Sequence, residues 1–554
     1  MSPYPHATAA QPSKRSKTSR QQSEYLTLNH YFELNRRYYR SIDLERDFDV
    51  RDALAGYVPT ECSLKTLVRI LPAIGRTDRH RAWTLTGVYG TGKSAFMHYL
   101  LALCAPPDSP IRQEAIALAA QSFGDEHEDY RDLLASVPSV PVFRAVAKGR
   151  SEPLNRTIAR ALVRGAESFW SGKQAARHDL ARLLFDWESE LDDDGFEVSD
   201  RQILSLLADL TREADTDMVL VIDELGKNLE YAARHRGTSD LYLLQQIAEL
   251  KLKGKHQVYF VGVLHQEFAG YSDRLSGRER NEWSKVQGRF ENVAFSESPN
   301  QMTRLLGRSI KRSGAVAIAA MLETQAQAWL DRLDPVVSPV EFPASVLAKA
   351  SPLHPLTAII LPELCLRYAQ NDRSLFAFMT SDEPNGFKQF LQSVIVTVTT
   401  ETGAETGAET ETGKQLSFGT GTGAGAIELP TLQLHQVYDY FVETASGMAS
   451  RLNLQRWVEV QTLIRDARTQ DESLLRLLKT IGILNLVTTG GHWRASPELV
   501  AAALCDRPDD HDQQLFWLDR IEAAKRAGIL THRQLVNELQ IGRASCRERV
   551  YLCV

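Results

Sequence analysis

The sequence lacks any long apolar segment. No apolar run in its 554 residues reaches the roughly 18 residues that a membrane-spanning helix needs. The N-terminal stretch also lacks the apolar core of a secretory signal peptide. These absences predict a cytoplasmic protein with no membrane partner.

Cysteine is scarce, and neither sign of charge dominates. The six cysteines are scattered, and none forms a Cys-x-x-Cys pair or a Cys/His cluster, so we expect isolated thiols and no zinc site. Lys and Arg number 64 against 70 Asp and Glu, which argues neither for nor against nucleic acid as a partner. The length predicts two to four domains.

Short apolar runs alternate with helical patterns over the first 300 residues. Such alternation predicts an α/β fold, with a parallel sheet that carries helices on both faces. The runs expected to be strands are 82–87, 140–147, 218–223, 258–264 and 291–295.

The segment GVYGTGKS, residues 87–94, matches the phosphate-binding pattern G-x-x-x-x-G-K-[ST] at every fixed position. The glycines let the backbone N–H groups turn toward phosphate oxygens, Lys93 brings a positive charge, and the Ser94 hydroxyl suits Mg²⁺. A glycine-rich turn without a ligand is the alternative, but an apolar strand precedes the loop and an apolar helix follows it. The residues expected to bind ATP are Gly87, Val88, Tyr89, Gly90, Thr91, Gly92, Lys93 and Ser94.

The segment MVLVIDE, residues 218–224, is an apolar strand that ends in two carboxylates. We expect Asp223 to hold Mg²⁺ together with Ser94, and Glu224 to polarise the attacking water as the catalytic base. Alone, this pattern is only the end of a strand; together with the upstream loop, which also supplies Lys93 to catalysis, it predicts ATP hydrolysis.

A further strand, VYFVGVLHQ at 258–266, ends in two polar residues. If the strands follow the usual order, His265 or Gln266 lies near the γ-phosphate and senses it. The alternative is a polar strand end that faces solvent.

The segment GRFENVAF, residues 288–295, resembles a part of AAA+ ATPases that carries an arginine reaching into a neighbouring subunit. The resemblance implies that Arg289 is catalytic in the site of a neighbour and that the active form is a homo-oligomer. A surface arginine before an edge strand is the alternative. In the helical lid that the family implies, Arg367 and Arg373 are candidates to contact phosphate.

Three longer stretches extend this resemblance over about residues 25–540. They are RSIDLERDFDVRDALAGYV (40–58), VIDELGKNLEYAA (221–233) and HPLTAIILPELCLRYAQNDRSLFAFMTSDEP (354–384). With the phosphate-binding loop, they are similar to large bacterial AAA+-type ATPases of phage-defence islands. The resemblance implies an AAA+-like P-loop fold, with DNA and other defence-system subunits as candidate partners.

The chain divides into six expected segments. Low-complexity sequence marks the fourth, and the last reads as a translated sequencing adapter, so we expect the natural chain to continue past Gln540. The segments are a disordered basic tail (1–22), an AAA+-like P-loop ATPase domain (23–298), a helical lid (299–397), a linker or loop (398–429), a helical, winged-helix-like domain (430–540) and an adapter artefact (541–554).

Two functions fit these features. The first is an ATP-driven motor or switch that acts on DNA or on a partner complex in phage defence. The second is a signalling or scaffold ATPase whose nucleotide state controls assembly without DNA contact. The absence of an NKxD motif disfavours a GTPase, and the adjacent Asp and Glu favour hydrolysis over transfer to a small molecule.

Overall fold

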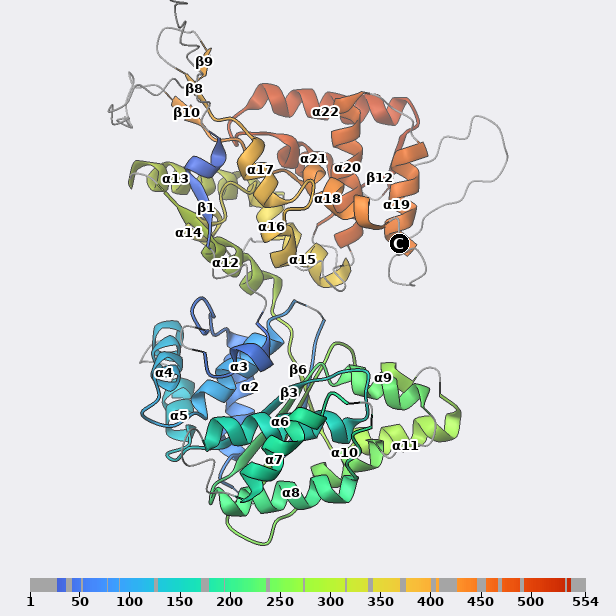
Figure 1. Cartoon of the computed structure of the whole chain (residues 1–554). Coiled ribbons are helices and arrows are strands. Elements are labelled where there is room, and N and C mark those ends of the chain that lie inside the picture. Colours follow the sequence, from blue (N-terminus) through green and yellow to red (C-terminus); the bar gives the residue numbers. More distant parts are fainter. Residues whose placement is uncertain are drawn as a thin grey trace, which may run out of the picture.

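A computed structural model gives the architecture of the chain (Figure 1). It describes residues 27–35, 42–50, 53–76, 78–88, 90–123, 128–170, 179–193, 195–235, 240–272, 275–313, 316–336, 342–368, 375–399, 405–407, 426–445, 455–466, 471–488, 493–533 and 536–539. The expected basic tail and the expected adapter segment lie outside these ranges.

Five parallel strands form the central sheet, in the order β3-β4-β5-β2-β6. All five expected strands are confirmed; the first four in sequence are almost wholly buried, whereas β6, at the edge of the sheet, is partly exposed. Their bounds are β2 (Ala82–Thr86), β3 (Phe143–Lys148), β4 (Met218–Asp223), β5 (Val258–Leu264) and β6 (Glu291–Ala294).

The strand order brings the two main sequence motifs together. The phosphate-binding loop follows β2, the Asp-Glu pair ends β4, and only β5 lies between these strands. Because all the strands run parallel, their carboxyl ends share one edge of the sheet. This edge therefore collects the polar residues that follow β2, β3, β4 and β5.

Helices cover both faces of the sheet, because successive strand residues point to opposite sides. In β4, Val219 and Val221 pack with α2, α3 and α4, whereas Leu220 and Ile222 pack with α6, α8 and α9. The helices of this domain are α1 (Leu44–Asp47), α2 (Glu61–Ile70), η3 (Leu71–Ala73), α3 (Lys93–Leu103), α4 (Pro110–Phe123), α5 (Glu128–Ser136), α6 (Leu154–Phe169), α7 (Asp179–Glu190), α8 (Asp200–Glu213), α9 (Gly226–Arg234), α10 (Asp240–Glu249), η5 (Phe268–Ser272) and α11 (Gly277–Gln287).

A second, mainly helical domain has its own apolar core. Residues 489–492 of the expected winged-helix-like domain lie outside the described residues. The helices are η1 (Leu28–His30), α12 (Pro299–Ser309), α13 (Val316–Leu333), α14 (Ala344–Lys349), α15 (Pro355–Tyr368), α16 (Leu375–Thr380), α17 (Phe387–Ser393), α18 (Leu434–Ala445), α19 (Gln455–Asp466), α20 (Glu472–Val487), α21 (Pro497–Leu504) and α22 (His511–Arg526).

Short strands interrupt this helical domain. The expected helical lid, residues 299–397, also contains β7 (Ile310–Arg312), which pairs antiparallel with β1 (Phe32–Leu34). Three short strands, one of which begins at the end of this lid, form a small antiparallel sheet in the segment 398–429, which was expected to be a linker or loop. The remaining strands are β8 (Thr397–Thr399), β9 (Glu405–Gly407), β10 (Ala426–Glu428), β11 (Leu530–Arg533) and β12 (Val536–Leu539).

The N-terminal segment contributes to both domains. Leu28 and Phe32 are buried in the core of the helical domain, although the expected boundaries place them in the ATPase domain. Leu44 and Phe48 are buried in the core beneath the sheet. Residues 28–34 therefore belong to the core of the helical domain, and residues 44–48 belong to that of the sheet domain.

Over the described residues, no helix is both long and apolar enough to cross a membrane.

Candidate active site

The phosphate-binding loop has a backbone that only glycine tolerates at three points. Gly90 and Gly92 have φ angles of 76° and 85°, in the left-handed region that side chains with a Cβ disfavour. A Cβ on Gly87 would lie 2.2 Å from the carbonyl oxygen of Phe295, so this position accepts no side chain without a backbone shift. Tyr89 lies outside the described residues.

Lys93, the first residue of α3, curls back over this loop. Its Nζ donates to the carbonyl oxygens of Gly87 and Val88, at 2.5 and 2.6 Å, and the Thr91 hydroxyl also donates to Val88. Only 4% of Lys93 is exposed. Burial lowers the pKa of Lys93 to about 8, although Asp223 and Glu224 act to raise it.

This lowered pKa predicts that ATP binding weakens at alkaline pH. Protonated Lys93 is lost as the pH rises through about 8, well below the usual range of lysine. We expect the affinity for ATP–Mg to fall about tenfold between pH 7 and pH 9, as measured by calorimetric titration. In Lys93→Met the remaining affinity should not change with pH over this range; a wild-type affinity that stays constant up to pH 9 would contradict the assignment.

Ser94 and Asp223 meet across the gap between α3 and β4. The Ser94 hydroxyl hydrogen-bonds to the carboxylate of Asp223, which is only 4% exposed. Burial raises the pKa of Asp223; the bond from Ser94 opposes this, and the neighbouring charge of Glu224 adds to it. A bound cation would offset the free-energy cost of burying the charged Asp223 carboxylate, so Ser94 and Asp223 fit Mg²⁺.

No group of three or more His, Cys, Asp or Glu side chains within the described ranges could hold a metal ion by itself. A magnesium ion bound to Ser94, Asp223 and phosphate oxygens does not need such a group, because Mg²⁺ usually keeps waters and takes oxygens from the substrate.

Glu224 lies beside this pair in a strained conformation. Its φ of 54° falls in the left-handed region, which costs a non-glycine residue on the order of 1 kcal/mol or more. The backbone N–H groups that follow β4 fix this turn: that of Glu224 donates to Asp223 Oδ1 at 3.0 Å, and that of Leu225 to the Val263 carbonyl at 3.0 Å.

Two lysines hold the carboxylate of Glu224. Lys148 Nζ lies 3.2 Å from Oε1, and Lys227 Nζ contacts Oε2. Burial alone would raise the pKa of Glu224, but Lys227 and Lys148 outweigh it and lower the pKa. Glu224 is therefore charged at neutral pH, as a base requires, and takes up a proton only below its usual range.

The helix that carries Lys227 is anchored to its neighbour. On α9, Asn228 Nδ2 donates to Thr157 Oγ1 at 2.8 Å and to the Glu152 carbonyl oxygen at 3.0 Å. Both acceptors lie at the start of α6 or just before it, which fixes Lys227 relative to β3.

Of the two candidate sensors, His265 lies closer to this charged cluster. Burial, and then the charge of Lys93, lower the pKa of His265 to about 4, although Glu224 acts to raise it. Gln266 is exposed, and its side chain lies against Gly270. We favour neutral His265 as the residue that faces the site.

Arg289 lies at the opposite edge of the sheet. It stands two residues before Glu291, which pairs with Trp83 near the start of β2, whereas the phosphate-binding loop follows the end of β2. With a rise of about 3.3 Å per strand residue, Arg289 is too far away to serve the site of its own chain. Its guanidinium pairs with Glu249 at 2.8 Å and remains 51% exposed, as a residue that reaches a neighbouring subunit would be.

Only one of the two lid candidates lies within the described residues. Arg367 lies in α15 and pairs with Glu363 one turn earlier, at 2.5 Å. Arg373 lies outside the described residues.

Lys148 and Lys227 were not among the residues expected at this site. Lys148 ends β3 and stands opposite Asp223 in the strand register, so the rule that strand ends share one edge could have identified it. Lys227 lies in the first turn of α9, three residues after Glu224, and its backbone N–H donates to the Glu224 carbonyl oxygen at 3.0 Å. This turn brings the two side chains into contact.

The strand order and the loop geometry define an AAA+-like P-loop fold, with a helical region after the sheet. The chain matches no protein-family model and no curated protein. Solved archaeal structures are weakly similar over most of their length. Cdc6p from Pyrobaculum aerophilum is 14% identical, with a TM-score of 0.29, over 89% of this chain and 94% of that one.

Two proteins of Aeropyrum pernix show a similar level of likeness. The ORC1 protein in complex with DNA is 13% identical, with a TM-score of 0.27, over 91% of this chain and 90% of that one. The ORC2 protein in its ADPNP–ADP complexes is 12% identical, with a TM-score of 0.30, over 92% and 93%. Scores this low add nothing to what the strand order shows.

Proposed function

We propose that this protein binds ATP–Mg at the carboxyl edge of its sheet and hydrolyses it. The observation that carries the proposal is that Lys93, Ser94, Asp223 and Glu224, which come from two separate motifs, lie within interaction distance of one another. The loop backbone and the buried lysine fit a triphosphate, and Ser94 with Asp223 fits magnesium.

In this proposal the chain's own groups carry out an in-line displacement. Glu224 accepts the proton of a water whose oxygen attacks the γ-phosphorus, while the bond from that phosphorus to the β–γ bridging oxygen breaks and ADP leaves. Lys93 supplies positive charge to the phosphates. When bound, Mg²⁺ neutralises phosphate oxygens and lowers the charge barrier to attack.

We further propose that hydrolysis drives a motor or switch that acts on DNA or on a partner complex, in a homo-oligomer. The half-exposed position of Arg289, away from its own site, supports oligomerisation. A role in phage defence rests on the sequence resemblance alone. The alternative is a signalling or scaffold ATPase that does not contact DNA.

Steady-state phosphate release with and without duplex DNA separates these two functions. A motor or switch on DNA should turn over several-fold faster with DNA, and the effect should weaken as salt rises because phosphate contacts are salt-dependent. Turnover that is unchanged by DNA at low salt would favour the scaffold function. No phosphate release by the wild-type protein under any of these conditions would contradict ATP hydrolysis itself.

A further inference from the structure

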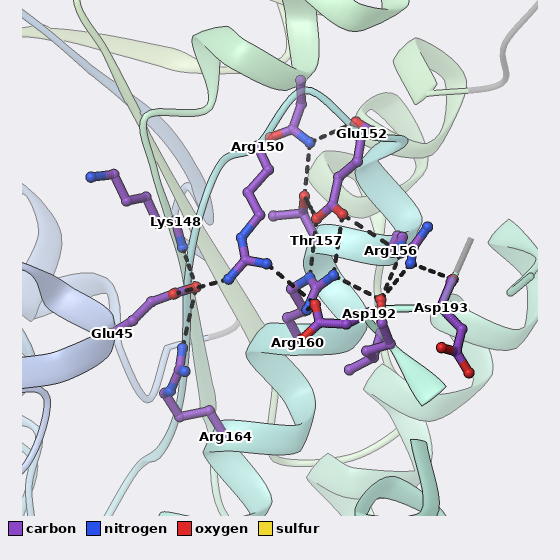
Figure 2. Close-up of polar contacts among 12 residues, drawn as sticks. Glu45, Lys148, Arg150, Glu152, Arg156, Thr157, Arg160, Arg164, Asp192 and Asp193 are labelled. Atoms are coloured by element: carbon purple, nitrogen blue, oxygen red, sulfur yellow. Dashed lines mark hydrogen bonds and ion pairs between the residues drawn. The ribbon is translucent and has the colours of Figure 1, made fainter. Parts of the chain in front are cut away.

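The N-terminal stretch 40–58 has no role in the ATP site described so far, yet one of its carboxylates reaches the loop beside Glu224. Glu45 lies in α1, which packs against β3 and α3. Its Oε1 accepts a hydrogen bond from the backbone N–H of Lys148, at 2.9 Å (Figure 2). Lys148 is the last residue of β3, and its side chain pairs with Glu224.

Glu45 also binds two arginines that flank this loop. Arg150 Nη2 lies 3.6 Å from Oε2, and Arg164 Nη1 lies 3.3 Å from Oε1 (Figure 2). The first arginine follows Lys148 by two residues, and the second comes from α6. One carboxylate therefore joins the end of β3, the loop after it and the helix that follows.

The segment around Glu45 is itself held firmly. Asp49 pairs with Arg144 of β3 at 2.8 Å, and the same guanidinium lies 4.7 Å from the ring centre of Phe48. Arg144 and Phe48 are both buried. These contacts fix the segment that carries Glu45 against β3.

The loop that Glu45 holds packs closely against the backbone of Asp223 and Glu224. Gly149 N donates to the Asp223 carbonyl oxygen at 2.6 Å. A Cβ on Gly149 would lie 2.3 Å from the carbonyl oxygen of Glu224. Any shift of residues 148–149 therefore moves the ammonium group of Lys148 relative to Glu224.

We propose that Glu45 is a positioning residue for ATP hydrolysis, which sets the place of Lys148 against Glu224. The proposal rests on the ATPase function proposed above. Through Glu45 the N-terminal segment has a role in the reaction, because a movement of α1 would change the contact between Lys148 and Glu224.

The split between turnover and ATP binding tests this role. Lys148 contacts the carboxylate of Glu224, so Lys148→Met should lower kcat several-fold and leave the Kd for ATP–Mg unchanged. Glu45→Ala should lower kcat in the same way with the ATP Kd unchanged. The double variant should lose no more turnover than Lys148→Met alone, because Glu45 acts through Lys148.

Glu45→Gln is the conservative variant. Its amide oxygen can still accept from the backbone of Lys148, so kcat should return to the wild-type value, although the charge facing Arg150 and Arg164 is lost. Glu61→Ala is the matched control, because Glu61 is an exposed carboxylate paired with Lys65. It should leave kcat unchanged.

Three outcomes would overturn the proposal: an unchanged kcat in Glu45→Ala, a slower turnover that weaker ATP binding accounts for, or losses that multiply in the double variant. Thermal melting of each variant shows whether it folds. If Glu45→Ala does not fold, a kcat of Glu45→Gln that matches Lys148→Met instead of the wild type would overturn the proposal. If Glu224→Gln leaves turnover intact, the proposed ATPase site fails. If Glu224→Gln is inactive and Glu45→Ala has the wild-type kcat, only the role of Glu45 fails.

Discussion

Replacing Glu224 by glutamine is expected to preserve ATP binding and to reduce steady-state turnover by roughly 100- to 10,000-fold. The amide has nearly the same shape as the carboxylate but cannot accept the proton of the attacking water. Lys93, Ser94 and Asp223 stay in place, so the Kd for ATP–Mg should change little. Phosphate release and calorimetric titration on the same preparation give both quantities.

Glu230→Gln provides the matched control. Glu230 lies on α9, six residues after Glu224, and forms a surface pair with Arg234. Its replacement should leave turnover unchanged. Full turnover in Glu224→Gln, with the control also active, would show that another group is the base.

Replacing Arg289 by alanine is expected to reduce turnover by roughly a thousand- to a hundred-thousand-fold without weakening ATP binding. The reason is geometric: Arg289 lies at the amino edge of the sheet and is exposed, so it can act only on the site of a neighbouring subunit. Removing it should spare the site of its own chain.

Mixing two inactive variants tests action between subunits. An oligomer that combines Arg289→Ala with Glu224→Gln contains some interfaces where an intact Glu224 meets an intact Arg289. With random mixing in equal amounts, about a quarter of the interfaces are complete, so turnover should return to about a quarter of the wild-type value. Arg278→Ala, which replaces an exposed arginine on the preceding helix α11, is the control and should stay active. No recovery in mixed oligomers would contradict the role of Arg289.

Much of the sheet could be predicted because its signals are local. Each central strand is a short apolar run between polar or glycine-rich segments, and each gave a strand close to its expected limits. The approach of Lys93 to Asp223 also followed from sequence, since two motifs at the ends of parallel strands must share an edge. Only the strand order, which places β5 between them, had to come from the structure.

The contacts that hold Glu224 could not be predicted in the same way. Lys148 reaches Glu224 because β3 and β4 pair in a register that aligns Lys148 with Asp223, and one residue of slip would turn its side chain to the other face. Glu45 lies 103 residues before Lys148 in sequence, and no periodicity links them. Such long-range polar contacts depend on the completed fold.

The pairing of β1 with β7 was missed for a related reason. These strands have three residues each, and a ladder this short has no alternating pattern long enough to stand out from its helical surroundings. The buried side chains of Leu28 and Phe32 fix it, and they show that the N-terminal segment belongs partly to the helical domain.

The position of the nucleotide in a crystal structure of Glu224→Gln, grown with ATP and Mg²⁺, tests the central claim most directly. We expect the triphosphate to lie inside the loop of residues 87–94 with its outer phosphates at Lys93, and the metal between Ser94 and Asp223. A nucleotide bound elsewhere, or a metal that contacts neither of these two residues, would contradict the account.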